Sequence, residues 1–125
     1  MASALTWFEI ATTDLDRAAN FYSTVLDKPL RREDFGGIPH GIFPYDPATN
    51  GIGGALVLDP QRTPSAEGAV IYLHIDSEAA LDTALRRVGE NGGRVLMPKT
   101  HIGDPGFIAL ILDTEGNRIG LNAIN

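Results

Sequence analysis

The sequence contains no cysteine among its 125 residues, and this absence excludes several classes of protein at once. Disulfide scaffolds, thiolate zinc sites, iron–sulfur clusters and cysteine nucleophiles all need a sulfhydryl group. Positive charge is also scarce, because 10 Lys and Arg residues oppose 16 Asp and Glu residues and leave a formal net charge of −6. No basic patch is available to neutralise phosphates, so we expect no nucleic-acid partner and no binding to an anionic membrane.

Long hydrophobic runs are missing as well. No stretch approaches the roughly 20 consecutive apolar residues that a membrane-spanning helix requires. The first residues, Met1–Leu5, have neither the basic nor the long apolar region of a secretory signal peptide. These absences predict a cytoplasmic protein. What the sequence does contain, 43% apolar and 21% charged residues, is typical of one soluble globular domain over residues 1–125.

The spacing of apolar residues in the first half predicts a strand, a helix and three further strands. Leu15, Ala18 and Tyr22 recur at helical spacing directly after Asp14, whose carboxylate can cap a helix. Pro29 prevents the helix from continuing. We expect a helix over residues 15–26 and strands over residues 5–11, 30–34, 40–45 and 52–58.

The second half repeats this order of elements. Leu81, Ala84 and Val88 form one apolar helix face after a cap at Asp76 or Ser77. The helix is expected to end at Gly92-Gly93, because glycine adopts left-handed backbone without steric cost. The expected strands of this half are residues 69–75, 94–97, 107–112 and 118–124.

A short motif also recurs between the two halves. Asp46-x-x-x-Asn50-x-Ile52-Gly53 matches Asp113-x-x-x-Asn117-x-Ile119-Gly120 at a constant offset of 67 residues. Four matches within eight positions, flanked by the same order of elements, indicate an internal duplication. The sequence therefore predicts an α+β fold of two βαβββ modules, at about residues 1–61 and 62–125.

Two longer motifs carry a family resemblance that covers the whole chain. They are Thr13-Asp14-Leu15-Asp16-Arg17-Ala18-x-x-Phe21-Tyr22 after the first strand, and Asp113-Thr114-Glu115-Gly116-Asn117-Arg118-Ile119-Gly120-Leu121 near the end. In this order they resemble the vicinal oxygen chelate superfamily, which includes glyoxalase I, bleomycin-resistance proteins, fosfomycin-modifying enzymes and ring-cleaving dioxygenases. The resemblance implies βαβββ modules whose curved mixed sheets enclose a cavity, and a chain of this size that forms a homodimer.

The resemblance also implies where family enzymes hold a divalent metal. Carried over position by position, the ligand sites of the two modules fall on Trp7, Val70, Gly120 and Gly53, or on Leu56 if the fourth strand is shifted. None of these side chains offers a basic lone pair to a cation. We therefore expect no metal and no other cofactor, and the metal-dependent chemistry of the family is not inherited through this motif.

Strand alternation predicts which residues share a face with Trp7 and Val70. The expected cavity lining is Trp7, Glu9, Gly53, Val70, Tyr72, His74, Arg118 and Gly120. The opposite face, with Phe8, Ile10, Ile71, Leu73, Ile75, Ile119 and Leu121, is expected to lie under the helices. A loop over residues 98–107 is expected to cover the cavity mouth. The predicted ligand-binding residues are Trp7, Glu9, Tyr72, His74, His101, Phe107 and Arg118.

Several of these residues have two interpretations. Trp7 either stacks on a ligand or packs at the module interface. Glu9 is either a general base, with a pKa raised by aromatic surroundings, or an ion-pair partner of Arg118. His74 and His101 either contact the ligand or are ordinary surface histidines. Glu9 with the three histidines, His40 included, has the residue types for a new metal site, but no local spacing brings two of them together.

Three functions are consistent with these residues. The leading interpretation is a metal-free protein of the bleomycin-resistance type, which binds a small molecule in its cavity. The alternative is an enzyme (lyase, isomerase, hydrolase or dioxygenase-like) that uses Glu9 or His101 as its base, with or without an atypically bound divalent metal. The third is a scaffold whose cavity has collapsed around core side chains.

Overall fold

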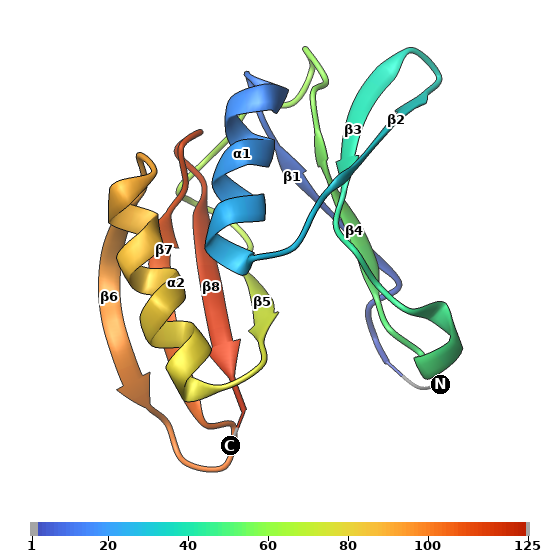
Figure 1. The fold of residues 1–125 in the computed structure, drawn as a ribbon. Coiled ribbons are helices and arrows are strands. Elements are labelled where there is room, and N and C mark those ends of the chain that lie inside the picture. The colour runs from blue at the N-terminus through green and yellow to red at the C-terminus, as the bar shows by residue number, and fades with distance from the viewer. Residues whose placement is uncertain (1–2, 125) are drawn as a thin grey trace.

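The computed structural model describes residues 3–124, so Met1, Ala2 and Asn125 of the predicted domain lie outside the described residues. Two α-helices, eight strands and one short 3-10 helix follow one another in this part of the chain (Figure 1). In chain order they are β1 (Trp7–Ala11), α1 (Leu15–Leu26), β2 (Arg31–Phe35), β3 (Ile38–Ile42), η1 (Pro47–Thr49), β4 (Gly53–Val57), β5 (Ile71–Ile75), α2 (Glu78–Glu90), β6 (Arg94–His101), β7 (Phe107–Leu112) and β8 (Arg118–Ala123).

The strands form two four-stranded sheets with the same topology. Their strand orders are β1-β4-β3-β2 and β5-β8-β7-β6. The pairs β1–β4 and β5–β8 are parallel, and all other neighbouring strands are antiparallel. The predicted α+β fold of two βαβββ units is therefore confirmed. The two sheets remain separate and do not close, so the expected enclosure of a cavity between curved sheets is not formed within this chain.

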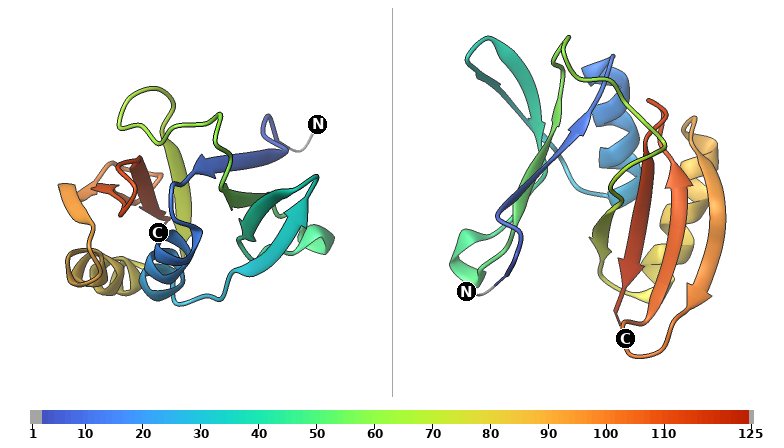
Figure 2. Two further views of the ribbon diagram at one scale, coloured as in Figure 1. Left: turned by 90° about the horizontal axis from the view of Figure 1, so that it is seen from above. Right: turned by 180° about the vertical axis from the view of Figure 1, so that it is seen from behind.

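Helix α1 lies between the two sheets, and α2 covers one face of the second sheet (Figures 1 and 2). Both helices begin where the sequence predicts, because Asp14 and Ser77 accept hydrogen bonds from the backbone N–H groups of Arg17 and Ala80 at 3.0 Å. Helix α1 ends at Asp27, whose left-handed backbone (φ 55°) turns the chain. Neither of the two helices in residues 3–124 is long and apolar enough to cross a membrane.

One hydrophobic core joins the helices to both sheets. It contains Ile10 and Leu56 of the first sheet, Leu73 and Leu121 of the second, and the inward faces of α1 and α2. The face that strand alternation assigns to the helices is therefore assigned correctly. The opposite face of the first sheet holds a small second cluster of Ile42, Ala55 and Val57. Trp7 on β1 and Tyr72 on β5 also lie on the faces away from the helices, and both are partly exposed.

The turn between β7 and β8 ties the second unit to the first helix. The Tyr22 hydroxyl of α1 donates to Asp113 Oδ2 at 2.6 Å inside the core. Burial, with the Asp113 carboxylate beside it, raises the pKa of Tyr22 well above its usual range, so the hydroxyl stays protonated and donates. Asn117 Nδ2 donates to the Ala11 carbonyl at 2.8 Å, and Asn117 Oδ1 accepts from the Ser65 N–H at 2.9 Å. These bonds hold β1 and the connector against the second sheet.

Strand β6 is longer than the sequence predicts. It continues through Pro98 to His101, so only residues 102–106 form the turn before β7. Proline is tolerated because β6 is an edge strand and its pairing with β7 is irregular between Met97 and Thr100. The loop expected over residues 98–107 is therefore reduced to a turn over residues 102–106.

Candidate functional site

The main cavity has a volume of about 760 Å³ and lies between the free edges of β1 and β5, which are the end strands of their sheets. Trp7, Phe8 and Glu9 line it from β1, and Tyr72, Leu73 and His74 line it from β5. The C-terminal end of α1 adds Leu26 and the following Lys28, while Phe43, Asn50 and Ile52 approach from the first sheet. The cavity is thus largely apolar with a few polar groups, as is typical of small-molecule sites.

Two aromatic rings lie over two glycines at equivalent places in the two sheets. Trp7 is paired with Gly53, and Tyr72 with Gly120, at the same step of the parallel ladders. A Cβ added to Gly53 would lie 2.8 Å from Trp7 Cζ3, and one added to Gly120 would lie closer still to the Tyr72 ring. The absence of a side chain on each glycine lets the neighbouring ring lie on the strand. With 37% and 47% of their surfaces exposed, both residues still offer area to a ligand.

The strand register corrects two of the positions at which the family resemblance places metal ligands. Tyr72, not Val70, is the counterpart of Trp7, because it pairs with Gly120 as Trp7 pairs with Gly53. The shifted alternative, Leu56, is fully buried in the helix-covered core and faces away from Trp7. The residues at these positions do not fit a divalent metal, because aromatic rings fill the space above both glycines.

An unconventional metal site is not formed either. Within residues 3–124, no three His, Asp or Glu side chains come together in a way that could hold an ion. The considered set of Glu9 with His40, His74 and His101 is therefore not assembled.

Glu9 is held by residues that the sequence did not connect to it. Arg62, from the connector between the units, donates to Glu9 Oε1, and Trp7 Nε1 donates to Glu9 Oε2 at 3.3 Å. The pairing with Arg118 is therefore wrong. Partial burial by itself would raise the pKa of Glu9, but the hydrogen bonds from Arg62 and Trp7, with His40 nearby, outweigh it and lower the pKa. The expected raised pKa is also wrong, and Glu9 is an ionised acceptor.

His40, expected at the start of a strand over residues 40–45, lies near Glu9. It belongs to β3 and is buried, with Nδ1 2.8 Å from the Ile38 carbonyl and Nε2 3.8 Å from Glu9 Oε2. A carbonyl only accepts hydrogen bonds, so Nδ1 carries a proton. The alternation of Ile38, His40 and Ile42 along one strand face was the signal that could have located it.

The other predicted ligand-binding residues lie away from the main cavity. Arg118 lines a separate pocket of about 180 Å³, which also contains Glu9. The rings of His101 and Phe107 pack against each other at a tilt of 54° with centroids 4.9 Å apart, and Lys99 Nζ lies 5.5 Å from the centre of the Phe107 ring. Phe107 pairs with the buried Ala123 and packs against the core on the helix side of the sheet. The structure thus brings Trp7, Glu9, Tyr72 and His74 together and leaves the other three outside.

Comparison with known proteins identifies the family to which this fold belongs. The sequence profile of the glyoxalase/bleomycin resistance protein/dioxygenase superfamily matches residues 4–121. The chain belongs to this superfamily. Its resemblance to the vicinal oxygen chelate proteins, inferred from the Asp14 and Asp113 motifs, is confirmed.

Individual relatives in the superfamily are distant. The putative glyoxylase CFP32 of Mycobacterium tuberculosis is 29% identical over 119 residues, covering 92% of this chain. The chain spans 43% of the length of that relative.

Among solved structures, a glyoxalase/bleomycin resistance protein from Albidiferax ferrireducens has a TM-score of 0.76 at 16% identity, covering 98% of this chain and 100% of its own. The genomically encoded fosfomycin resistance protein FosX of Listeria monocytogenes has a TM-score of 0.70 at 14% identity, covering 100% and 94%. At these identities the structural likenesses show the fold alone.

Proposed function

We propose that this superfamily member is a small-molecule-binding protein that holds a flat, partly apolar compound between Trp7 and Tyr72. The observation that carries the proposal is the pair of rings, each lying over a glycine, at the two free strand edges that border the 760 Å³ cavity. Aromatic faces held in this way can stack on a flat ligand with little loss of side-chain freedom. Glu9 presents an ionised acceptor to a donor group of the ligand.

The same contacts favour binding over catalysis at this site. A general base works best with a pKa near the working pH. Glu9 is already engaged by Arg62 and Trp7, and these contacts lower its pKa. His101 packs against Phe107 outside the cavity. Binding requires no change in these contacts, whereas acid–base catalysis by Glu9 or His101 would require their side chains to move.

Titration with N-phenyl-1-naphthylamine, a neutral fluorescent aromatic compound, tests the proposal. Trp7 is the sole tryptophan, so its emission reports directly on the site. We expect saturable quenching of Trp7 and a matching rise in probe emission, with a Kd in the micromolar range, on the order of −8 kcal/mol. A linear response without saturation, or one that an unrelated protein of equal size reproduces, would contradict ligand binding.

We further propose that the protein acts as a homodimer in the cytoplasm. Leu5 and Val70 leave apolar surface beside the unpaired edges of β1 and β5. Exposed strand edges and apolar patches are usually covered in soluble proteins, and a second copy would cover them. Light scattering is expected to give twice the 13.4 kDa mass of one chain. A monomer over a hundredfold range of concentration would exclude the dimer.

A further inference from the structure

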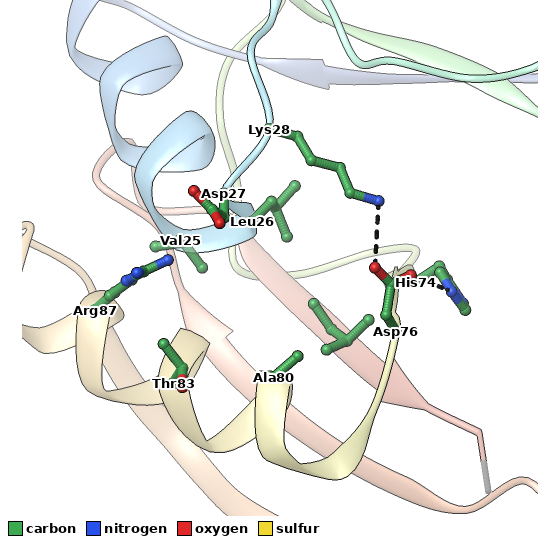
Figure 3. Close-up of a pocket in the computed structure, with 10 residues that line it drawn as sticks. Val25, Leu26, Asp27, Lys28, His74, Asp76, Ala80, Thr83 and Arg87 are labelled. Carbon is green, nitrogen blue, oxygen red and sulfur yellow. Dashed lines mark hydrogen bonds and ion pairs between the residues drawn. The ribbon is translucent and has the colours of Figure 1, made fainter.

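A second pocket adjoins the main cavity at the end where α1 meets α2. This inter-helix pocket has a volume of about 240 Å³ and is bordered by Val25 and Asp27 of the α1 end and by Ala80, Thr83 and Arg87 of α2 (Figure 3). Leu26, Lys28 and His74 line both the pocket and the main cavity. The two spaces are therefore neighbours, and a side chain such as Lys28 can be reached from either of them.

The polar side chains of this pocket lie on two sides of it. Lys28 Nζ lies 4.0 Å from Asp76 Oδ2, and His74 Nε2 lies 3.1 Å from Asp76 Oδ1 (Figure 3). On the opposite side of the pocket from Lys28, Arg87 Nη1 donates to the Thr24 carbonyl at 3.2 Å, near the end of α1 (Figure 3). The side chains of Lys28 and Asp76 are 45% and 70% exposed, so solvent and solutes reach them.

Lys28 and Arg87 retain unused hydrogen-bonding capacity. A distance of 4.0 Å is beyond hydrogen-bond length, so the Lys28 ammonium attracts Asp76 without donating to it. Arg87 has five N–H groups, and the bond to Thr24 uses one of them. Asp76 already accepts from His74, and Asp27 is the other carboxylate of the pocket. The pocket thus contains two cationic and two anionic side chains. An anionic ligand group that reaches Lys28 would accept the hydrogen bond that Asp76, at 4.0 Å, does not accept.

We propose that the cavity and the inter-helix pocket together bind an amphipathic aromatic anion. Its flat body stacks on Trp7 and Tyr72, and its carboxylate, sulfonate or phosphate group binds Lys28, which lines both the cavity and the pocket. This inference rests on the proposed function and adds the charge of the ligand to it. At the other end of the cavity, Glu9 is already neutralised by Arg62, so the site does not present a free carboxylate to a cationic ligand.

Two probes that share one aromatic body separate the two proposals. N-phenyl-1-naphthylamine has the body alone, and 8-anilinonaphthalene-1-sulfonate adds a sulfonate. We expect Lys28→Gln to weaken binding of the sulfonate probe about three- to fivefold, the effect of one partly exposed ion pair, and to leave the Kd of the neutral probe unchanged. Arg87→Gln is expected to leave the Kd of both probes unchanged, because Arg87 lies on the opposite side of the pocket from Lys28 and does not line the main cavity. Arg86→Gln is the matched control, because Arg86 is on the same helix but pairs with Glu90 and does not line the pocket.

Each outcome has a distinct meaning. An unchanged Kd for the sulfonate probe in Lys28→Gln overturns the anion site and leaves the proposed function standing. An equal increase in the Kd of both probes also overturns the anion site, because the substitution would then affect binding of the shared aromatic body and not of the sulfonate. If the neutral probe does not bind to the unaltered protein, the proposed function itself fails. Circular dichroism of each variant establishes that it is folded, and Lys28→Met provides a second test of the lost charge.

Discussion

Trp7→Ala is expected to weaken binding of N-phenyl-1-naphthylamine roughly thirtyfold, about 2 kcal/mol at 25 cal/mol per Å² for the part of the indole that faces the ligand. The substitution removes one of the two stacking rings, and Gly53 beneath it has no side chain to replace the lost area. It also removes the hydrogen bond from Trp7 Nε1 to Glu9. Because no other tryptophan is present, the variant must be titrated through the emission of the probe.

Two further variants make this result specific. Tyr72→Ala is expected to weaken binding by a similar factor, since Tyr72 is the counterpart of Trp7 on β5. Phe35→Ala is the control, because Phe35 is also an exposed aromatic residue but lies on β2 and does not line the cavity. An unchanged Kd in Trp7→Ala, or an equal loss in Phe35→Ala, would show that the probe binds elsewhere on the surface.

Glu115→Gln is expected to lower the free energy of unfolding by about 3 kcal/mol at pH 7. The Glu115 side chain is fully buried and accepts from Arg17 Nε at 2.7 Å and from the backbone N–H groups of Thr13 and Asp14 at 2.9 and 3.0 Å. Burial by itself would raise the pKa of Glu115, but these bonds outweigh it and lower the pKa to about 2. A difference of about 2.5 pKa units from the ordinary value of 4.5 corresponds to about 3 kcal/mol.

The dependence on pH follows from the sign of this shift. A carboxyl group whose pKa is lower in the folded state stabilises the fold fully above its unfolded pKa, and the contribution is lost as the pH falls toward the folded pKa. The difference in free energy of unfolding between the unaltered protein and Glu115→Gln should therefore be largest above about pH 5 and fall to about half of that value by pH 3. Urea unfolding at several pH values measures it. Glu90→Gln is the control, with a change below about 0.5 kcal/mol, because Glu90 is exposed. A difference that stays constant between pH 7 and pH 3 would contradict the assigned role of the Glu115 carboxylate.

The sequence by itself determined the order of the elements and the two faces of each sheet. Alternation along a strand has a fixed period of two, so Trp7 and Glu9 had to share one face, as did Tyr72 and His74. The caps at Asp14 and Ser77 depend on neighbouring residues, and the repeated Asp-x-x-x-Asn motif precedes the last strand of each unit. These features are local, and local features can be predicted without knowing how the elements pack.

The tertiary structure alone decided which distant residues meet. It placed Arg62 rather than Arg118 on Glu9, put Phe107 on the helix side of its sheet, and brought Lys28 near Asp76 and His74. Each of these contacts depends on the path of a connector, the register of an antiparallel pair or the packing of a helix end against a sheet. Such arrangements depend on the packing free energy of many buried side chains from both units together. The spacing of residues within one segment does not determine this free energy.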